Sequence, residues 1–376
     1  MGKRRITPAE LAIGSVLAWD AHDEHGRLLL RKGQVITSMS QVDGLMERGL
    51  FVETDPARDK PQRYGEEVEP SAVSLILDAR RRLQLLSSAN GSKQDFVQQV
   101  LGIRMLIAQA CCLSQDAALA TALLARVGRY SIRHSLDVAI TCHIVGNSLG
   151  MDEPELTSTI AAALTMNLSI LQLQDDLQAQ KEPLSDAQRA IIQRHPEESA
   201  ALLRALDVTD ETWLHVVLSH HEAIDGSGYR LGKKGDEIPL PSQLVSLGDV
   251  YCARISSREY RRALRPNAAL KALFLDQGKK VRDGLASQFI KAIGVFPAGT
   301  PVRLDNGEIA VVTQRGETAS TPHVCSVIGP RGMPLHPPVK RDTSLATYGV
   351  REVVEWAELG ATPSMQALWG KVAAIH

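Results

Sequence analysis

The densest group of side chains that could do chemistry lies in one short segment past the middle of the chain. It runs from His220 to Tyr229 and reads His-His-Glu-Ala-Ile-Asp-Gly-Ser-Gly-Tyr. Imidazole nitrogens bind iron, manganese, zinc and nickel, and a neighbouring carboxylate adds a hard oxygen ligand. Adjacent residues at a helix end can face one cavity only if the chain bends, and Gly226 and Gly228 permit such a bend. The segment indicates a metal or ligand site, against the alternative of an exposed polar helix end.

Residues elsewhere in the chain carry the same kinds of groups. His134 and His195 lie in apolar helical patterns, and Asp249 is a carboxylate inside a largely apolar helical stretch, where it needs a compensating cation. Arg258 and Arg261 follow on the same segment, three residues apart, and could clamp one phosphate group. Each has a structural alternative. These are a core or capping histidine, an ion-paired aspartate, and a solvated basic face.

Helical periodicity covers the part of the chain that must position these groups. Apolar residues recur at helical spacing from about residue 71 to residue 293, with few β-branched runs and few prolines. The pattern favours a compact all-α domain. We expect helices at about 114–127, 131–149, 153–170, 185–206 and 208–222, another from about residue 241, and a last pair within 266–293.

The two ends of the chain have strand and turn patterns in place of helical periodicity. Strand-like segments and a turn precede a polar, proline-containing stretch, and after residue 294 prolines crowd around strands with an Asp-Asn-Gly hairpin turn at 305–307. We therefore expect five parts: a small α+β module at 1–53, a linker at 54–70, a helical domain at 71–294, a β appendage at 295–345 and a helical tail at 346–376.

Composition limits the classes of protein that the chain can belong to. The 376 residues include 42 basic and 43 acidic side chains, and this balance disfavours general binding to DNA or RNA. No apolar stretch is expected to reach the length of a membrane span, and no apolar core of a secretory signal follows the N-terminus. The five cysteines lack Cys-x-x-Cys spacing, so neither a disulfide framework nor a zinc–thiolate site is supported. We expect a soluble, cytoplasmic protein that does not interact with a membrane.

Several of these segments together resemble the HD-GYP family. Residues 220–239 are similar to the family pattern HHExxDGxGYPxGLxGxxIP, and residues 248–253 to its DxYDA element. Residues 258–263 are similar to RPYRxA, and residues 289–304 to FxxxxGxxPxGxxVxL. The elements follow one another in the family's order, and the resemblance spans about residues 95–345.

The resemblance implies an HD-type all-α helical bundle that hydrolyses cyclic di-GMP, a bacterial second messenger, to pGpG or GMP. It also implies a centre of two or three divalent metal ions, with iron or manganese favoured over zinc, which activates water and polarises the phosphodiester. By position, the metal ligands are His195, His220, His221 and Asp249, with His134 matching an upstream histidine. Arg258 and Arg261 match phosphate contacts. The further ligand-binding candidates are Asp225, Gly226, Gly228 and Tyr229, and the catalytic candidates are Asp249 and His221.

The chain departs from the family where the HD pair should stand. The family reads LHDIGK, and residues 164–169 here read Leu-Thr-Met-Asn-Leu-Ser, which puts Thr165 at the histidine and Met166 at the metal-bridging aspartate. Ser169 replaces the lysine, Arg230 the proline of GYP, and Tyr130 an upstream acid. A neutral thioether cannot offset the repulsion between two hard cations. We therefore expect one bound metal ion or none.

Three functions remain open at this point. The leading hypothesis is a catalytically impaired HD-GYP protein that senses cyclic di-GMP or binds signalling partners. The second is an active metal-dependent cyclic di-GMP phosphodiesterase that uses the remaining ligands. The third is a scaffold without catalysis that recruits another signalling protein, such as a GGDEF-type diguanylate cyclase. A homodimer is also left open.

Overall fold

The computed structural model describes residues 2–5, 21–22, 27–30, 51–54, 69–87, 95–229, 231–257, 263–276 and 278–375. The chain divides into two units, Met1–Glu69 and Pro70–His376. The first unit contains a four-stranded antiparallel sheet in the order β1-β4-β2-β3. Its strands are β1 (Gly2–Arg5), β2 (Ala21–His22), β3 (Leu28–Leu30) and β4 (Phe51–Thr54). The helical part of the module expected at 1–53 and most of the linker expected at 54–70 lie outside the described residues.

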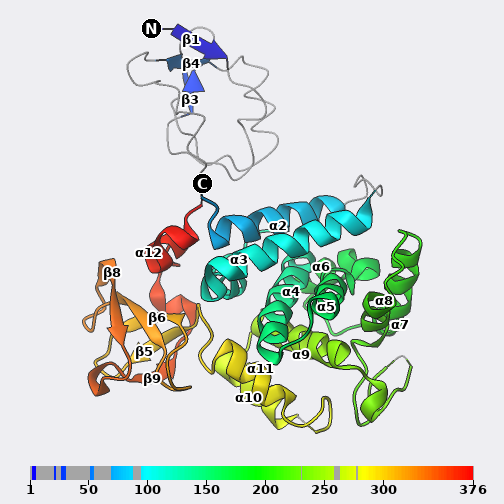
Figure 1. The fold of residues 1–376 in the computed structure, drawn as a ribbon. Helices are drawn as coiled ribbons and strands as arrows, with labels where there is room; N and C mark the ends of the chain where they lie inside the picture. The colour runs from blue at the N-terminus through cyan, green and yellow to red at the C-terminus, as the bar shows by residue number, and fades with distance from the viewer. Residues whose placement is uncertain are drawn as a thin grey trace. The chain divides into compact units, whose positions relative to one another are not determined.

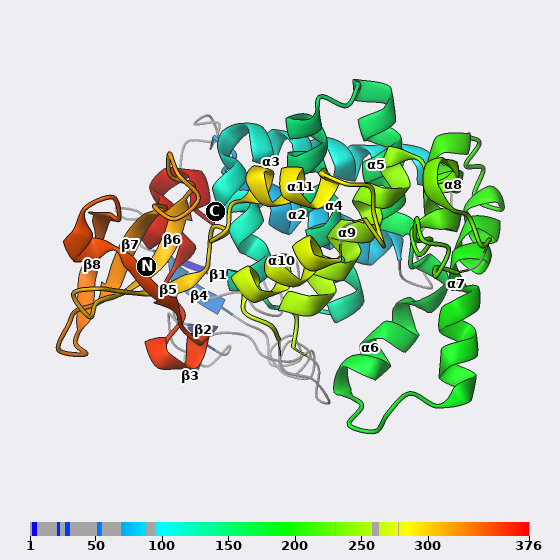
Figure 2. The same ribbon diagram turned by 90° about the horizontal axis from the view of Figure 1, so that it is seen from below.

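The second unit consists mainly of helices, as predicted, and Figures 1 and 2 show them stacked around a central helix, α4 (Tyr130–Leu149). The helices predicted to start at about 131, 153, 185 and 208 begin within a few residues of those positions, because their start signals are present in the sequence. The helix predicted at 114–127 is instead the second half of a longer one, Phe96–Leu124, which is kinked at Ser114. Asp152, Ser185 and Asp210 each accept a hydrogen bond from a backbone N–H in the first turn of the helix that follows. The helices are α2 (Ala72–Leu86), α3 (Phe96–Leu124), α4 (Tyr130–Leu149), α5 (Glu153–Thr165), α6 (Leu171–Ala179), α7 (Asp186–Arg204), α8 (Glu211–Ser219), α9 (Leu240–Ile255), α10 (Pro266–Leu275) and α11 (Leu285–Ile293).

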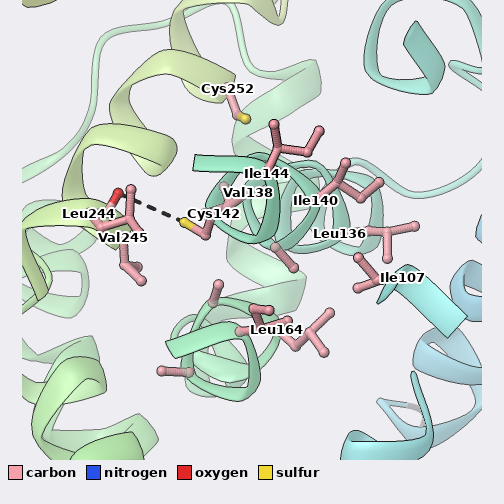
Figure 3. Close-up of a cluster of buried hydrophobic side chains, with 14 of the residues drawn as sticks. Ile107, Leu136, Val138, Ile140, Cys142, Ile144, Leu164, Leu244, Val245 and Cys252 are labelled. Carbon is pink, nitrogen blue, oxygen red and sulfur yellow. Dashed lines mark hydrogen bonds between the residues drawn. The ribbon is translucent and has the colours of Figure 1, made fainter. Parts of the chain in front are cut away.

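Helix α4 is buried along most of its length and packs against α5, α9 and α3. Figure 3 shows the side chains that fill this core, where the Cys142 thiol lies 3.8 Å from the carbonyl oxygen of Leu244 on α9. A side chain at Gly248 would approach the Cys142 sulfur to 3.1 Å and Val138 to 3.2 Å. The glycine therefore permits α9 to lie close against α4, and this contact brings Asp249 next to the buried face of α4.

A five-stranded antiparallel sheet in the order β8-β7-β6-β5-β9 follows the helices, and α12 (Met365–Trp369) packs beside it. Figures 1 and 2 show the sheet at one end of the second unit, with α7 and α8 at the other. The predicted hairpin turn at 305–307 joins β5 to β6, and the backbone N–H of Leu304 donates to the carbonyl of Glu308 over 2.9 Å. The strands are β5 (Pro301–Leu304), β6 (Ile309–Gln314), β7 (His323–Ile328), β8 (Pro334–Asp342) and β9 (Val350–Val353). The predicted fold class, mainly α with small β-containing units, is confirmed.

Two expectations need correction. The segment 346–376 is not simply a helical tail, because β9 pairs with β5 and buries Val353 against Val302 and Leu304. Valines at 350, 353 and 354 fit a helical face as well as a strand, and the free edge of β5 decides between the two. The expectation that no apolar stretch reaches the length of a membrane span is also wrong. The helical stretches Phe96–Leu124 and Glu153–Ala179 pass that test of length and composition, which buried helices of soluble proteins also pass. Both contribute side chains to the core around α4.

Candidate metal centre

Three histidines, one from α7 and two from the segment directly after α8, meet at one point. His195 lies in α7, His220 follows the last residue of α8, and His221 comes next in the chain. Each offers a ring nitrogen within 4.8 Å of the other two. The ring centroids of His220 and His221 are 4.1 Å apart, and each is about 5 Å from that of His195, at 5.1 and 5.0 Å. His195 and His220 are buried, and His221 is partly exposed. The structure thus brings together three of the five predicted metal ligands.

The hydrogen bonds of His195 and His220 fix which ring nitrogen carries the proton. Nδ1 of His195 donates to the carbonyl of Ile192 over 2.5 Å, and Nδ1 of His220 donates to the carbonyl of Val217 over 2.7 Å. Burial lowers the pKa of both imidazoles, that of His195 to about 3, so both rings are neutral at pH 7. A neutral imidazole carries one proton, so both Nε2 atoms present bare lone pairs.

These two Nε2 atoms lie 3.1 Å from each other. Two lone pairs at that distance repel unless a cation lies between them. Nitrogen ligands that are each about 2.1 Å from one ion are separated by about 3 Å or slightly more. The donor set of three imidazoles therefore fits a divalent transition-metal ion, which favours nitrogen ligands.

Asp249 and His134 form a pair of their own. Nε2 of His134 lies 2.7 Å from Oδ1 of Asp249, and the Asp249 side chain is 15% exposed. Burial alone would raise the pKa of Asp249, but the hydrogen bond and charge of His134, together with His221 and His220, outweigh burial and hold this pKa below its usual range. The carboxylate is therefore ionised beside the histidines, although its oxygens lie outside the three-histidine group. Their predicted role as ligands remains a proposal.

The loop after α8 is folded back on His221. The Tyr229 ring stacks on the His221 ring with centroids 4.7 Å apart, and the Tyr229 N–H donates to the His221 carbonyl over 3.2 Å. Gly228 makes this turn, because a Cβ there would lie 2.4 Å from the Ala223 nitrogen and 2.6 Å from the His221 carbonyl oxygen. Gly228 and Tyr229 thus position His221. Their predicted role in ligand binding remains a proposal.

Two acidic side chains of the same loop are engaged in holding its backbone. Both oxygens of the buried Glu222 accept backbone N–H groups, from Leu231 over 2.5 Å and from Lys233 over 3.1 Å. The exposed Asp225 accepts the N–H of Ser227 over 2.8 Å, with Gly226 between them at a φ of 78°. The predicted role of Asp225 and Gly226 in ligand binding remains a proposal.

Comparison with known proteins identifies the helical part of the chain. The model of the HD domain family matches residues 113–283, which include all three histidines and the His134–Asp249 pair. Residues 113–283 form an HD domain.

Relatives with similar sequences are named as cyclic dinucleotide phosphodiesterases. A cyclic di-GMP phosphodiesterase of Pseudomonas aeruginosa is 27% identical over 284 residues, which cover 72% of this chain and 66% of that protein. The cyclic di-GMP phosphodiesterase PdeB of Borreliella burgdorferi is 25% identical and covers 50% of each chain. The chain thus spans between half and about two thirds of the length of these relatives.

A solved HDG"Y"P protein from Bdellovibrio bacteriovorus has the same fold. It matches with a TM-score of 0.50 and 14% identity, over 77% of this chain and 99% of that chain. This likeness confirms the HD-type helical fold.

The side chains of the segment that was expected to align with the HD pair, residues 164–169, have structural contacts. The Thr165 hydroxyl accepts a hydrogen bond from the Trp213 indole over 2.8 Å and donates to the Ala161 carbonyl over 2.7 Å. Met166 is fully buried in the hydrophobic core. The Ser169 hydroxyl donates to the backbone carbonyl of His195 over 3.2 Å, so this segment is hydrogen-bonded to α7. Neither Thr165 nor Met166 offers a carboxylate or an imidazole.

The predicted phosphate-binding arginines cannot be placed. Arg258, Arg261 and Arg230 lie outside the described residues, so their roles stay predictions. The sequence analysis missed another arginine, Arg254 on α9, which lines a cavity together with His221. Its only signal in the sequence is a charged residue in the last turn of an apolar helix, which is common at helix ends for reasons unrelated to ligands.

Proposed function

We propose that this protein binds cyclic di-GMP at an HD domain that holds one divalent metal ion, with iron or manganese preferred, and that it hydrolyses the nucleotide weakly or not at all. The observation that carries the proposal is the group formed by His195, His220 and His221, with two bare Nε2 atoms 3.1 Å apart. The relatives named as cyclic di-GMP phosphodiesterases support the choice of nucleotide.

The residues around the histidines fit a role in binding a phosphodiester. A divalent ion bound there would supply a positive charge for a phosphoryl oxygen and would acidify a bound water. Asp249, kept ionised by His134, adds a negative charge that favours a cation at this point. Tyr229 covers one face of the His221 ring and limits the access of water.

The segment of the expected HD pair supports the proposal of impaired hydrolysis. Phosphodiester hydrolysis at a binuclear site needs a group that bridges two cations. Thr165 and Met166 provide no such group, and both are fixed in the core by contacts unrelated to a metal ion. We therefore assign a single ion to the histidine side of the site.

An active phosphodiesterase is the second candidate. The histidine group and the His134–Asp249 pair favour it, because together they offer ligands and an ionised carboxylate beside them. The two candidates agree on the nucleotide and on a metal ion and differ in turnover.

The experiment measures cyclic di-GMP binding and turnover by the full chain, with Mn²⁺ or Fe²⁺ added and with the His221→Ala variant as a control. We expect saturable binding to the wild type and product formation close to that of the variant. Brisk turnover that His221→Ala abolishes would establish the active enzyme. The absence of binding would refute the proposed function.

A second variant tests whether the site is a degraded catalytic centre. The double change Thr165→His and Met166→Asp restores an imidazole and a carboxylate at the two positions. We expect it to raise both the metal content and the turnover of protein that still unfolds cooperatively. A folded double variant whose metal content and turnover stay at wild-type levels would argue against our alignment of residues 164–169 with the HD pair.

A further inference from the structure

A cavity of about 220 Å³ opens beside His221. The loop after α8 forms one wall, α9 and α10 form another, and the turn that follows α10 closes it. Its size suits a phosphate group with an adjoining sugar and is too small for a whole cyclic dinucleotide. The residues that matter for its chemistry are His221, Glu222, Tyr229, Arg254, Asp276 and Lys280.

Arg254 brings an incompletely paired guanidinium to this cavity. Its Nη2 donates to Oδ2 of Asp276 over 3.2 Å, whereas its Nη1 is buried and has no hydrogen-bond partner in the described part of the chain. Buried polar groups are nearly always paired, because a buried donor without a partner loses its hydrogen bonds to water, and the loss is larger when the donor belongs to a charged group. The side chain is 25% exposed, so a ligand in the cavity can reach it.

Lys280 adds a second cation from the opposite wall. Its Nζ donates to the Ser227 hydroxyl over 2.6 Å, and an ammonium has two further protons to donate. Its backbone carbonyl accepts the N–H of Ile224, so the turn that carries Lys280 is tied to the loop after α8. Both cations are thus held in place before any ligand binds, which lowers the entropy cost of binding.

The carboxylates that line the cavity leave several N–H donors of Arg254 and Lys280 available for a ligand. Glu222 is satisfied by two backbone N–H groups, and Asp276 engages only one nitrogen of Arg254. An anion in the cavity would meet the Arg254 side chain, which lines it, and the free protons of Lys280. Guanidinium and ammonium groups together are the usual partners of phosphate oxygens.

We propose that Arg254 and Lys280 form a phosphate subsite next to the histidine group. The inference rests on the proposed function in one respect, the identity of the ligand. A cyclic dinucleotide carries two phosphodiester groups. The three histidines take one of them through the bound ion, and Arg254 with Lys280 takes the other, which sets the orientation of the nucleotide.

The test compares binding by isothermal titration of the full chain with two probes, cyclic di-GMP and inorganic pyrophosphate. The variants are Arg254→Gln, which loses the charge, and Arg254→Lys, which keeps it. Arg265→Gln is the matched control, because Arg265 is exposed, pairs with Glu355 over 3.3 Å and does not line the cavity. Thermal unfolding verifies that each variant is folded.

We expect Arg254→Gln to weaken cyclic di-GMP binding by about tenfold to a hundredfold, the loss typical of a charge-assisted hydrogen bond. Arg254→Lys should lose less, and Arg265→Gln should bind like the wild type. Wild-type affinity in Arg254→Gln would overturn the inference and leave the proposed function intact. Binding of pyrophosphate alone, dependent on Arg254, would refute the proposed nucleotide and keep the subsite. Binding of neither probe would refute both.

Discussion

His195 and His220 show how a metal site is prepared by hydrogen bonds that point away from it. Each Nδ1 is committed to a backbone carbonyl three residues earlier in its own helix, at Ile192 and Val217. This fixes the tautomer and aims each Nε2 at the common point, as in metal-ligating histidines generally. The ability to bind a cation therefore depends on these two backbone carbonyls as much as on the histidines themselves.

The hydrogen bond between the Thr165 hydroxyl and the Trp213 indole gives Thr165 a structural role that can be tested. In Thr165→Val the indole N–H of Trp213 loses its acceptor in a fully buried position, which should lower the free energy of unfolding by about 1–3 kcal/mol. Chemical denaturation measures this change.

Thr159→Val is the matched control for that variant, because the Thr159 hydroxyl donates only to the Glu155 carbonyl of its own helix. We expect it to cost clearly less than Thr165→Val. Equal losses in the two variants would show that the Trp213 contact contributes nothing special to stability.

The candidate site could be predicted from the sequence as far as local motifs reach. His220 and His221 are adjacent and conspicuous, and the family resemblance adds His195 by position. Arg254 could not be predicted, because its significance depends on Asp276 and Lys280, which reach it only through the folding of α10 against α9. Nor could the sequence tell that Glu222 holds a loop rather than a metal ion.

At the scale of elements, the bend after α8 determines where His221 lies. An alanine at Gly228 would place its Cβ within 2.6 Å of three backbone atoms of residues 221–223, so the loop must move. We expect Gly228→Ala to weaken metal binding by about 10- to 100-fold, the range seen when groups that orient a ligand are removed. Competition with a metal-sensitive dye measures the affinity.

Gly102→Ala is the control for the substitution at Gly228. Gly102 lies in α3 with nothing within 4 Å of the added Cβ, so alanine there should leave metal binding unchanged and stabilise the helix slightly. Metal affinity in Gly228→Ala equal to that of the wild type would mean that the loop does not position His221.

The starts of several helices could be predicted because their signals are local in the sequence. At the start of α7, the Ser185 side chain accepts the Gln188 N–H, and the Gln188 side chain accepts the Ser185 N–H. The strand β9 could not be predicted, because its conformation depends on pairing with β5, about fifty residues earlier in the chain. Val353 sits opposite Val302 of β5, and this pairing overrides the helical spacing of the valines.

At the scale of the whole molecule, one buried carboxyl makes stability depend on pH. Burial raises the pKa of Asp137 to about 6, although Arg80, Arg133 and Arg126 counteract it. The folded chain therefore holds this proton to higher pH than the unfolded chain, whose aspartates titrate near 3.8. By linkage, the contribution of this one group to the free energy of unfolding falls as pH rises from about 4 to about 6, by roughly 3 kcal/mol at most. The buried histidines, whose pKa values are lowered, contribute with the opposite sign.

The Asp137→Asn variant isolates that contribution. The free energy of unfolding of the wild type, measured from denaturation curves at several pH values, should decrease relative to that of the variant as pH rises from 4 to 6. Parallel curves for the two proteins would mean that Asp137 titrates alike in the folded and unfolded chains, and that the arginines around it offset its burial completely.

Elemental analysis of the purified full chain measures directly how many metal ions the histidine group holds. We expect no more than one equivalent of tightly bound divalent metal per chain, lost in His220→Ala and kept in His215→Ala, whose half-exposed ring belongs to α8 but not to the histidine group. Two or more equivalents in the wild type, or one equivalent that survives His220→Ala, would contradict this expectation.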